Sequence, residues 1–412
     1  MTPRDYDLVV YGATGFVGRQ AVRELAAHPE IGRLRWAIAG RDRARLEALA
    51  REHGARAVIV ADARDVPAIE ALVARTRVVL ALAGPFSQYA DAIVAACASG
   101  GTHYADITGE TPWVRTLIDR YHDRALASGT RIVPGCGFDS VPSDLGAFLV
   151  ARLAQRELGA DASEVRAYYT MAGGANGGTL ATLAGVLGDP KTDAQMRDPE
   201  LLTPEHRRLG KTWTGRLRDP VTASYDVAAG TWVAPFFMGP INTRVVRRSA
   251  ALSADYDEPY AEAFSYQEYF KFGLTSGGPF AASAVALGTF AGMAAMRMPG
   301  AQRAVAALLP PPGTGPSQKA REGGWFRCEL IGFLTGGRRV YGTVAATGDP
   351  GNVATSTFAV ESALALALDG KQLPGGSKRG GVLTPATAIG DVLVARLRAR
   401  GMTLEAGRAR TS

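Results

Sequence analysis

The chain has few of the residues that build disulfide frameworks and metal sites. Among its 412 residues there are three widely separated cysteines, a pattern that is not typical of a disulfide framework. The five histidines include no pair at metal-ligand spacing, and the Gly-x-Ser-x-Gly motif of serine hydrolases is absent. The cysteines are Cys97, Cys136 and Cys328, and the histidines are His28, His53, His103, His122 and His206. These absences disfavour metal-dependent and hydrolytic chemistry, and we expect no metal site.

The chain also lacks a dense block of basic residues. Its formal charge is +7 and its pI is about 9.4, but the arginines responsible are spread along the sequence. Without a basic stripe interleaved with aromatic residues, a nucleic-acid partner is not expected. A basic balance suits an anionic partner instead, such as a phosphorylated cofactor, an acyl thioester or a membrane face.

Long uncharged runs are rare, and no signal peptide precedes the first apolar run, so we expect a cytoplasmic protein. One run, residues 272–296, has no charge over 25 residues, which is long enough to span a membrane. Alanine, glycine and serine dominate it, and Gly277-Gly278-Pro279 interrupts its first third. Three interpretations stay open: a buried or interface helix, a surface that contacts a membrane or a lipidic substrate, and a membrane span.

A glycine-rich turn follows the first apolar run of the chain. After residues 8–11, three glycines occur in the spacing Gly-x-x-Gly-x-x-Gly, and an amphipathic pattern follows them. This order is typical of a dinucleotide-binding domain, in which the pyrophosphate lies against backbone N–H groups at a helix N-terminus. The alternative is a glycine-rich turn of some other α/β protein. The predicted cofactor-binding residues of this turn are Gly12, Thr14, Gly15, Phe16, Val17 and Gly18.

Strand-like apolar runs alternate with helical patterns through the first third of the chain. The further runs are 34–39, 58–60, 78–83, 103–106 and 131–133. This alternation predicts a doubly wound parallel sheet, a Rossmann domain over residues 1–140. Ligands of such sheets lie beyond the carboxyl ends of the strands. Asp62 and the turn Gly84-Pro85-Phe86 are therefore also predicted to contact the cofactor.

The end of the second predicted strand indicates which dinucleotide binds. NAD-specific folds place an acidic residue about 20 residues after the glycine turn, whereas this chain has Gly40 and Arg41 there. A guanidinium can bind a 2′-phosphate bidentately and stack on adenine. Arg41 therefore favours NADP(H). The neighbouring Asp42 weighs against this choice unless it caps the helix that follows.

The pattern changes after about residue 140. Helices are expected at 145–158 and 385–398, and strands at 165–171, 241–248, 325–333 and 338–344, the last two forming a hairpin. Such a mixture predicts an α+β domain with a mainly antiparallel sheet. We assign residues 141–380 to this substrate domain and residues 381–412 to a C-terminal segment.

Several strings resemble those of the saccharopine dehydrogenase-like oxidoreductases. They are the glycine turn, Ala39-Gly40-Arg41, Gly84-Pro85-Phe86, residues 104–110, residues 135–144, Asn176-Gly177-Gly178-Thr179, residues 241–244, residues 247–249 and residues 381–386. Within that superfamily the chain is most similar to the trans-acting enoyl reductases of mycobacterial lipid synthesis. The resemblance implies an NADP-binding Rossmann domain, an α/β substrate domain and a last helix packed back on the Rossmann domain. It does not specify the substrate.

Hydride transfer is the chemistry that these features favour. In the reduction of an enoyl thioester, hydride adds to the β-carbon, hydrogen-bond donors stabilise the enolate, and an acid protonates the α-carbon. Tyr104 and Asp139 are the predicted catalytic residues, because their strand ends face the cofactor crevice. The structural alternatives are that Tyr104 belongs to the core and that Asp139 and Asp144 cap a helix.

Three arginines in the second half have two open interpretations. Arg244, Arg247 and Arg248 would alternate around the strand expected at 241–248, and would contact an anionic thioester carrier or face water. We therefore expect an NADP(H)-dependent oxidoreductase that reduces a C=C bond of an enoyl, acyl or lipid-like substrate, free or carrier-bound. The alternatives are a saccharopine-type amino acid dehydrogenase acting on a C=N bond and a non-catalytic, membrane-associated NADP-binding protein. A homodimer is left open.

Overall fold

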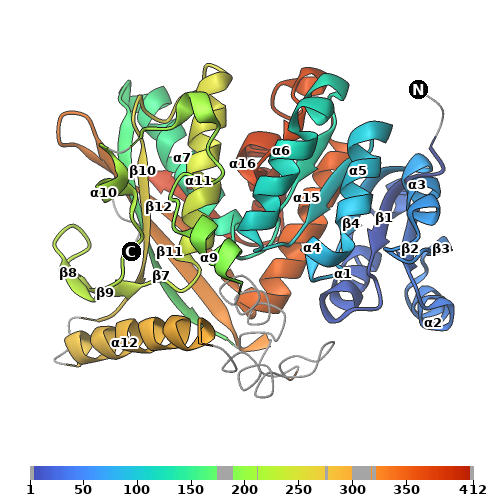
Figure 1. Cartoon of the computed structure of the whole chain (residues 1–412), viewed down its shortest axis with the longest axis horizontal. Helices are drawn as coiled ribbons and strands as arrows, with labels where there is room; N and C mark the ends of the chain where they lie inside the picture. Colours follow the sequence, from blue (N-terminus) through green and yellow to red (C-terminus); the bar gives the residue numbers. More distant parts are fainter. Residues whose placement is uncertain are drawn as a thin grey trace.

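The computed structural model describes residues 4–173, 189–210, 212–273, 277–298, 317 and 322–408. Two seven-stranded sheets, A and B, stand side by side, with helices between them (Figure 1). Sheet A is parallel throughout, and sheet B is mixed and mostly antiparallel. The predicted fold class, a Rossmann sheet with a second α+β unit, is confirmed.

Sheet A has the strand order β13-β6-β5-β4-β1-β2-β3. Its strands are β1 (Tyr6–Tyr11), β2 (Trp36–Gly40), β3 (Ala57–Val60), β4 (Thr76–Ala81), β5 (His103–Asp106), β6 (Arg131–Val133) and β13 (Gly381–Val382). The central strands are almost wholly buried, as expected of apolar runs covered on both faces. The first six follow the strand order of dinucleotide-binding folds. The seventh, β13, comes from the far end of the chain and was not predicted.

Helices cover both faces of sheet A. On one face lie α1 (Phe16–Ala26), α2 (Arg43–His53) and α15 (Thr355–Leu368), and on the other α3 (Val66–Ala74), α5 (Asp91–Gly100) and α6 (Thr111–Ser128). Helix α15 is buried along nearly its whole length and contacts β1, β4 and β5. The C-terminal third of the chain thus supplies both a strand and a helix to the N-terminal sheet.

Sheet B has the order β14-β12-β11-β7-β10-β9-β8, and within it only β7 and β10 pair in parallel. Its strands are β7 (Ala162–Ala172), β8 (Ser224–Asp226), β9 (Thr231–Pro235), β10 (Ser265–Lys271), β11 (Trp325–Leu334), β12 (Arg339–Thr347) and β14 (Thr403–Gly407). Helix α7 (Val141–Leu158) packs closely on the sheet, since a Cβ on Gly146 would lie 2.8 Å from Leu330 Cδ1. The expected strand at 165–171 and the expected hairpin are both present.

The strand expected at 241–248 is wrong, because these residues lie in helix α11 (Gly239–Asp255). The guanidinium of Arg244 binds the carbonyl oxygen of Met196 at 2.8 Å, and that of Arg247 binds those of Pro199 and Tyr266, each at 2.9 Å. All three arginines are at most 4% exposed, so neither a carrier nor water is their main partner. Eight residues of mixed polarity fit the period of a strand as well as that of a helix. In the helix, the guanidinium groups reach the buried carbonyl groups that bind them.

The last helix expected at 385–398 is divided in two. Helices α16 (Pro385–Ala388) and α17 (Asp391–Ala399) are separated at Gly390, whose φ of +54° suits glycine. Helix α17 packs against α15 and β14. The string at 176–179 lies outside the described residues. Two short helices, α9 (Pro190–Met196) and α10 (Thr214–Leu217), belong to the polar region before β8.

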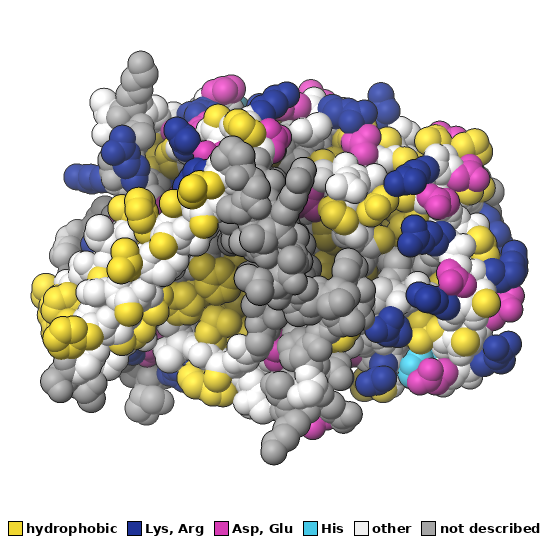
Figure 2. Space-filling view, turned by 60° about the horizontal axis from the view of Figure 1, so that its bottom comes forward, with side chains coloured by type: hydrophobic (Ala, Val, Ile, Leu, Met, Phe, Trp, Pro, Cys, Tyr) yellow, Lys and Arg dark blue, Asp and Glu magenta, His cyan; other side chains and the backbone are white. Residues whose placement is uncertain are grey.

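Helix α12 (Gly278–Met296) lies on the surface below sheet B (Figure 1). It packs through Ala282 and Ala286 against Ala234 of β9, while Phe280, Leu287 and Phe290 are 77%, 68% and 62% exposed. Hydrophobic side chains accordingly gather over this helix in Figure 2. By length and composition alone this helix could span a membrane. Only 17% of its apolar window is buried by the rest of the chain. The helix is therefore not buried within the single chain, and the interface part of the first interpretation stays a prediction.

Candidate active site

The glycine turn presents the N-terminus of α1 at the carboxyl edge of sheet A. Gly12 has φ +78°, and a Cβ there would lie 2.7 Å from the backbone nitrogen of Ala83 after β4. Gly15 occupies the N-cap position of α1, and no described side chain caps that helix. The close backbone approach at Gly12 and the glycine at the N-cap of α1 fit a dinucleotide pyrophosphate, which binds N–H groups at such an end.

The ends of β2 and β3 place two exposed charges at the carboxyl edge of sheet A. Arg41 directly follows β2 and Asp62 follows β3. The pKa of Tyr11, at the end of β1, is raised to about 12, mainly by burial. The charge of Asp62 also raises this pKa, whereas the charge of Arg41 lowers it. Asp62 and Arg41 therefore both lie near the Tyr11 hydroxyl. Asp42 caps α2 by accepting a hydrogen bond from Arg45 N at 3.0 Å, as the helix-cap interpretation required. Its carboxylate is thereby engaged in the helix cap.

A carboxylate from the loop after β5 holds the turn after β4. The turn Gly84-Pro85-Phe86 opens the short helix α4 (Phe86–Tyr89), and Pro85 has no side chain that could cap it. Glu110 supplies the cap instead, accepting hydrogen bonds from Phe86 N at 2.6 Å and Ser87 N at 3.1 Å. Glu110 was missed as a functional residue. A helix that starts after proline without a local cap was the available signal.

Tyr104 is a fully buried residue of β5. Its hydroxyl donates a hydrogen bond to Asp106 Oδ2 at 2.7 Å, and burial raises its pKa well above 10. Asp106 Oδ1 in turn accepts hydrogen bonds from Thr108 N and Gly135 N, both at 2.9 Å. Tyr104 therefore reaches the carboxyl edge only through Asp106, which joins the loops after β5 and β6.

Asp139 has the opposite environment. It is the least buried residue of the loop at 134–140, and burial alone raises its pKa to about 7, with no hydrogen bond or ion pair from a described residue opposing the shift. Ser140, not Asp139, takes the N-cap position of α7. Phe138 fixes the loop between the sheets, because its N–H donates to Thr355 Oγ1 and its ring contacts Phe326 edge-on. Asp139 is thus an available carboxyl group where the two sheets meet.

Asp144 is the residue of that loop and helix with a structural role. It accepts hydrogen bonds from Ser249 Oγ and from Ala386 N, the latter at 2.8 Å, and so ties α7 to α11 and α16. Burial raises its pKa to about 7 as well. Its carboxylate is satisfied and does not reach the crevice.

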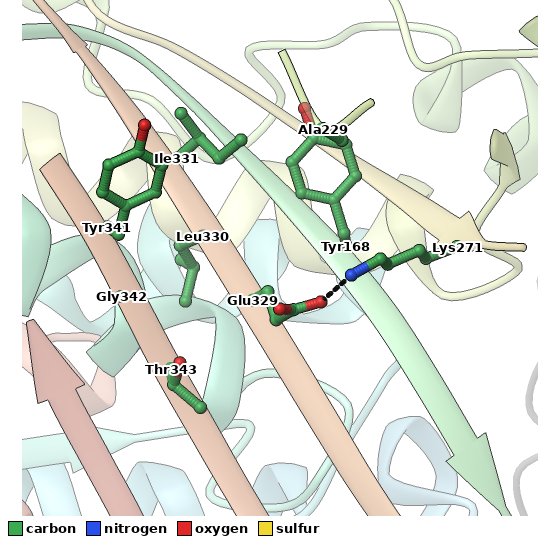
Figure 3. Close-up of a pocket in the computed structure, with 9 residues that line it drawn as sticks. All are labelled: Tyr168, Ala229, Lys271, Glu329, Leu330, Ile331, Tyr341, Gly342 and Thr343. Carbon is green, nitrogen blue, oxygen red and sulfur yellow. Dashed lines mark hydrogen bonds and ion pairs between the residues drawn. The ribbon is translucent and has the colours of Figure 1, made fainter. Parts of the chain in front are cut away.

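A separate hollow lies on the face of sheet B opposite α7 (Figure 3). Its two charged side chains, Lys271 and Glu329, form an ion pair across the strands β10 and β11. Because these charges neutralise each other and no strand of sheet A ends there, this hollow offers little to a dinucleotide or to hydride chemistry. The carboxyl edge of sheet A is therefore the candidate active site.

A parallel sheet in the dinucleotide-binding strand order, with a glycine turn and an arginine after β2, is the arrangement of the dinucleotide-dependent oxidoreductases. The family model of the saccharopine dehydrogenase NADP-binding domain matches residues 8–133. The chain is 39% identical to the trans-acting enoyl reductase of Mycobacterium ulcerans over 98% of both chains, and 37% identical to that of Mycobacterium tuberculosis over 97% of both. Another Mycobacterium tuberculosis protein, assigned to the trans-acting enoyl reductases by name, is 40% identical over 99% of both chains.

Among solved structures, the saccharopine dehydrogenase (L-Glu forming) of Saccharomyces cerevisiae aligns over 98% of this chain and 99% of its own, with a TM-score of 0.57 and 15% identity. This likeness concerns the fold alone. The chain belongs to the saccharopine dehydrogenase-like oxidoreductases, in the branch of the trans-acting enoyl reductases. It is an NADP(H)-dependent oxidoreductase.

Proposed function

We propose that this enzyme reduces the C=C bond of an enoyl thioester or a related acyl substrate, with Asp139 as the proton donor. The observation that carries the proposal is the environment of Asp139, a carboxyl group with a raised pKa, some exposure and no described partner at the carboxyl edge. Similar proteins named trans-acting enoyl reductases support the same acceptor. Bound NADPH supplies the hydride.

We propose that the chain binds the cofactor along the carboxyl edge of sheet A. The N-terminus of α1, with the backbone of Gly12 to Gly18, receives the pyrophosphate. Arg41 binds the 2′-phosphate, and Asp62 lies beside the adenosine. The turn at 84–86 lies against the nicotinamide ribose, and Glu110 keeps that turn in place through its two hydrogen bonds.

Asp139 donates the proton that the reduction requires. Addition of hydride to the β-carbon leaves electron density on the α-carbon and the thioester oxygen, and the Asp139 carboxyl donates its proton to the α-carbon. A carboxyl group with a pKa near 7 is protonated in a large fraction of molecules at neutral pH. The exposed part of its side chain allows solvent to restore the proton. Tyr104 acts as a positioning residue, because it holds Asp106 and through it the loop at 134–140.

The test is NADPH oxidation by the purified chain with a panel of acceptors. We expect turnover with enoyl pantetheine thioesters and none with preformed imines of amino acids. Turnover with imines alone would support the saccharopine-type alternative. Retained NADPH binding with no turnover on either class would support the non-catalytic alternative, and both results would overturn the proposal.

For α12 we propose contact with a lipid surface from the cytoplasmic side. The support is its uncharged sequence and the exposed Phe280, Leu287 and Phe290. Flotation with phospholipid vesicles should recover the parent chain and not the triple variant Phe280→Ser, Leu287→Ser, Phe290→Ser. If both float equally, or if light scattering shows a dimer that the triple variant loses, the surface is not a lipid-binding one.

A further inference from the structure

A polar cavity lies near the amino ends of β6 and β13, at the opposite edge of sheet A from the candidate active site. Arg379, just before β13, lines it together with residues of α7, α11, α16 and the start of α17. It measures about 190 Å³, against about 20 Å³ for the hollow of Figure 3. A water molecule takes about 30 Å³ of the liquid, so a ligand of several non-hydrogen atoms fits. We propose that this cavity binds a small organic carboxylate with a single negative charge, at a site separate from the proposed reaction.

The guanidinium group of Arg379 is the main reason to expect an anion. Arg379 is only 8% exposed, and its Cζ lies 3.8 Å from the ring centroid of Tyr256. Its Nη1 donates to the carbonyl oxygen of Thr387 at 3.3 Å, and its Nε is covered by the loop at Gly375, where a Cβ would lie 2.8 Å from it. No described residue forms a hydrogen bond or ion pair with Nη2. A buried cation without a carboxylate is unfavourable, so Nη2 is the nitrogen that a ligand anion would bind.

Two further features make this end of the sheet positive. Arg131, the first residue of β6, is 2% exposed and donates to the carbonyl oxygens of Pro374 at 2.8 Å and Gly376 at 2.6 Å, while no carboxylate of a described residue pairs with it. Burial, and then the neighbouring charge of Arg379, lowers the pKa of Arg131 to about 10, so the two cations lie close together. The N-terminus of α17 also lines the cavity without a capping side chain from the described residues, and such an end carries positive charge.

The acidic groups of the lining limit the charge of the ligand. Asp391 is paired with Arg152 at 2.8 Å, whereas Glu258 is exposed and forms no ion pair with a described residue. The lining thus holds two arginines and two acids, and Arg131 behind it leaves an excess of one positive charge. A monoanion balances this excess, whereas Glu258 would repel a dianion.

The remaining walls favour an organic ligand. Apolar side chains contribute to them from α7, from the turn before α17 and from α17 itself, namely Phe148, Ile389 and Val392. These surfaces suit a short hydrocarbon body next to the charged group. A carboxylate with a few carbons therefore satisfies both the charge and the lining, which inorganic phosphate does not.

The test is isothermal titration calorimetry of the full chain saturated with NADP⁺. The ligands are butyrate, butylammonium and inorganic phosphate, and butyrate should bind about tenfold or more tightly than the other two. Arg379→Met removes the charged donor, so the affinity for butyrate should fall about tenfold or more, and Arg379→Lys should restore part of it. Equal or tighter binding of butylammonium or phosphate, or an unchanged affinity of Arg379→Met for butyrate, would overturn the inference.

Glu258→Gln tests the same site without disturbing the core, because Glu258 is exposed. Loss of its negative charge should raise the affinity for butyrate about two- to fivefold, in the range of exposed charge pairs. The matched control is Glu262→Gln, exposed and outside the cavity, with no expected effect. A parental affinity in Glu258→Gln would contradict the inference.

Asp139→Asn separates this site from the candidate active site. The variant should bind butyrate as the parent does, because Asp139 lies at the other edge of sheet A. A loss of butyrate binding in this variant would place butyrate at the active site and overturn the inference. Since the titration involves no hydride transfer, failure to reduce enoyl thioesters would contradict only the proposed reaction.

Discussion

Asp139 and Glu268 have similar titration behaviour but opposite surroundings. Burial raises the pKa of each carboxyl group to about 7. Glu268, on β10 of sheet B, accepts hydrogen bonds from Tyr266 at 2.7 Å and Asn242 at 2.9 Å, and a further one from Ser143. Asp139 has no described partner and keeps some exposure. A raised pKa alone therefore does not identify an acid; an available proton and access to the crevice do.

Arg41 and Arg247 differ in the same way, one without a described partner and the other hydrogen-bonded. Arg41 is exposed at the end of β2, and no hydrogen bond or ion pair from a described residue engages it. Arg247 is buried and holds two backbone carbonyl groups, and burial lowers its pKa to about 10. We call the first kind of group open and the second kind closed. Open groups should affect binding or rate, and closed groups should affect stability.

The largest effect is expected for the open acid. Asp139→Asn keeps the size of the side chain but removes the proton, so kcat should fall by about 10²- to 10⁴-fold with unchanged affinity for NADPH. In the parent enzyme, activity should decline as pH rises above about 7, because the protonated form is the donor. Asp139→Asn should lose this decline. Steady-state kinetics from pH 5.5 to 9 measure both effects, and a variant with parental kcat would remove Asp139 from the mechanism.

The open cation should affect one cofactor only. Arg41→Ala removes the charge that we propose binds the 2′-phosphate, so the Kd for NADPH should rise roughly 10- to 100-fold while that for NADH stays unchanged. Arg51, on the solvent side of α2, provides a matched control variant, Arg51→Ala, with no expected effect. Fluorescence titration with both cofactors measures the ratio. Equal losses of affinity for NADPH and NADH would show that Arg41 does not bind the 2′-phosphate.

Replacing a closed cation should affect stability and leave binding unchanged. Arg247→Met leaves the carbonyl groups of Pro199 and Tyr266 without their donor, and the free energy of unfolding should fall on the order of 2–4 kcal/mol. KM for the acyl substrate should not change at a temperature where the variant is folded. Urea denaturation and steady-state kinetics measure the two quantities, with the exposed Arg23→Met as the control. A large rise in KM with parental stability would return Arg247 to a substrate-binding role.

The smallest kinetic effect is expected for the closed acid. Glu268→Gln should keep kcat within about threefold, because Glu268 is sealed from the crevice. Its pKa is raised from 4.5 to about 7 in the folded chain, so its contribution to stability is complete below pH 4.5 and is lost as pH rises through 7. The parent should therefore lose Tm as pH rises from about 4.5 to about 7 and level off above that, and the variant should lose less. An unchanged pH dependence of Tm would show that Glu268 does not titrate in this range.

The sequence could predict features that depend on neighbouring residues, but not those that depend on contacts with distant segments. The first six strands of sheet A, the glycine turn and Arg41 follow from local patterns, because a turn and a strand end are specified by adjacent residues. Strand β13 and helix α15 could not be assigned to sheet A, since their contacts depend on residues more than 200 positions away. Helix α11 was mistaken for a strand because its buried arginines are satisfied by a distant segment.

The candidate site shows the same limit. Glu110 lies in a string that was already singled out, but its role became visible only with the uncapped helix α4 beside it. Tyr104 and Asp139 could not be distinguished by sequence, since both follow strands of the same sheet. The difference between them is the hydrogen bond from Tyr104 to Asp106, which no spacing encodes.

The most direct test follows both hydrogens into one product. The parent enzyme is supplied with an enoyl pantetheine thioester and NADPH carrying deuterium at C4, first in H₂O and then, with unlabelled cofactor, in D₂O. Our account predicts one deuterium at the β-carbon in the first experiment and one at the α-carbon in the second, read by NMR of the saturated thioester. Deuterium from the cofactor at the carbonyl carbon, or the absence of a saturated product, would contradict it.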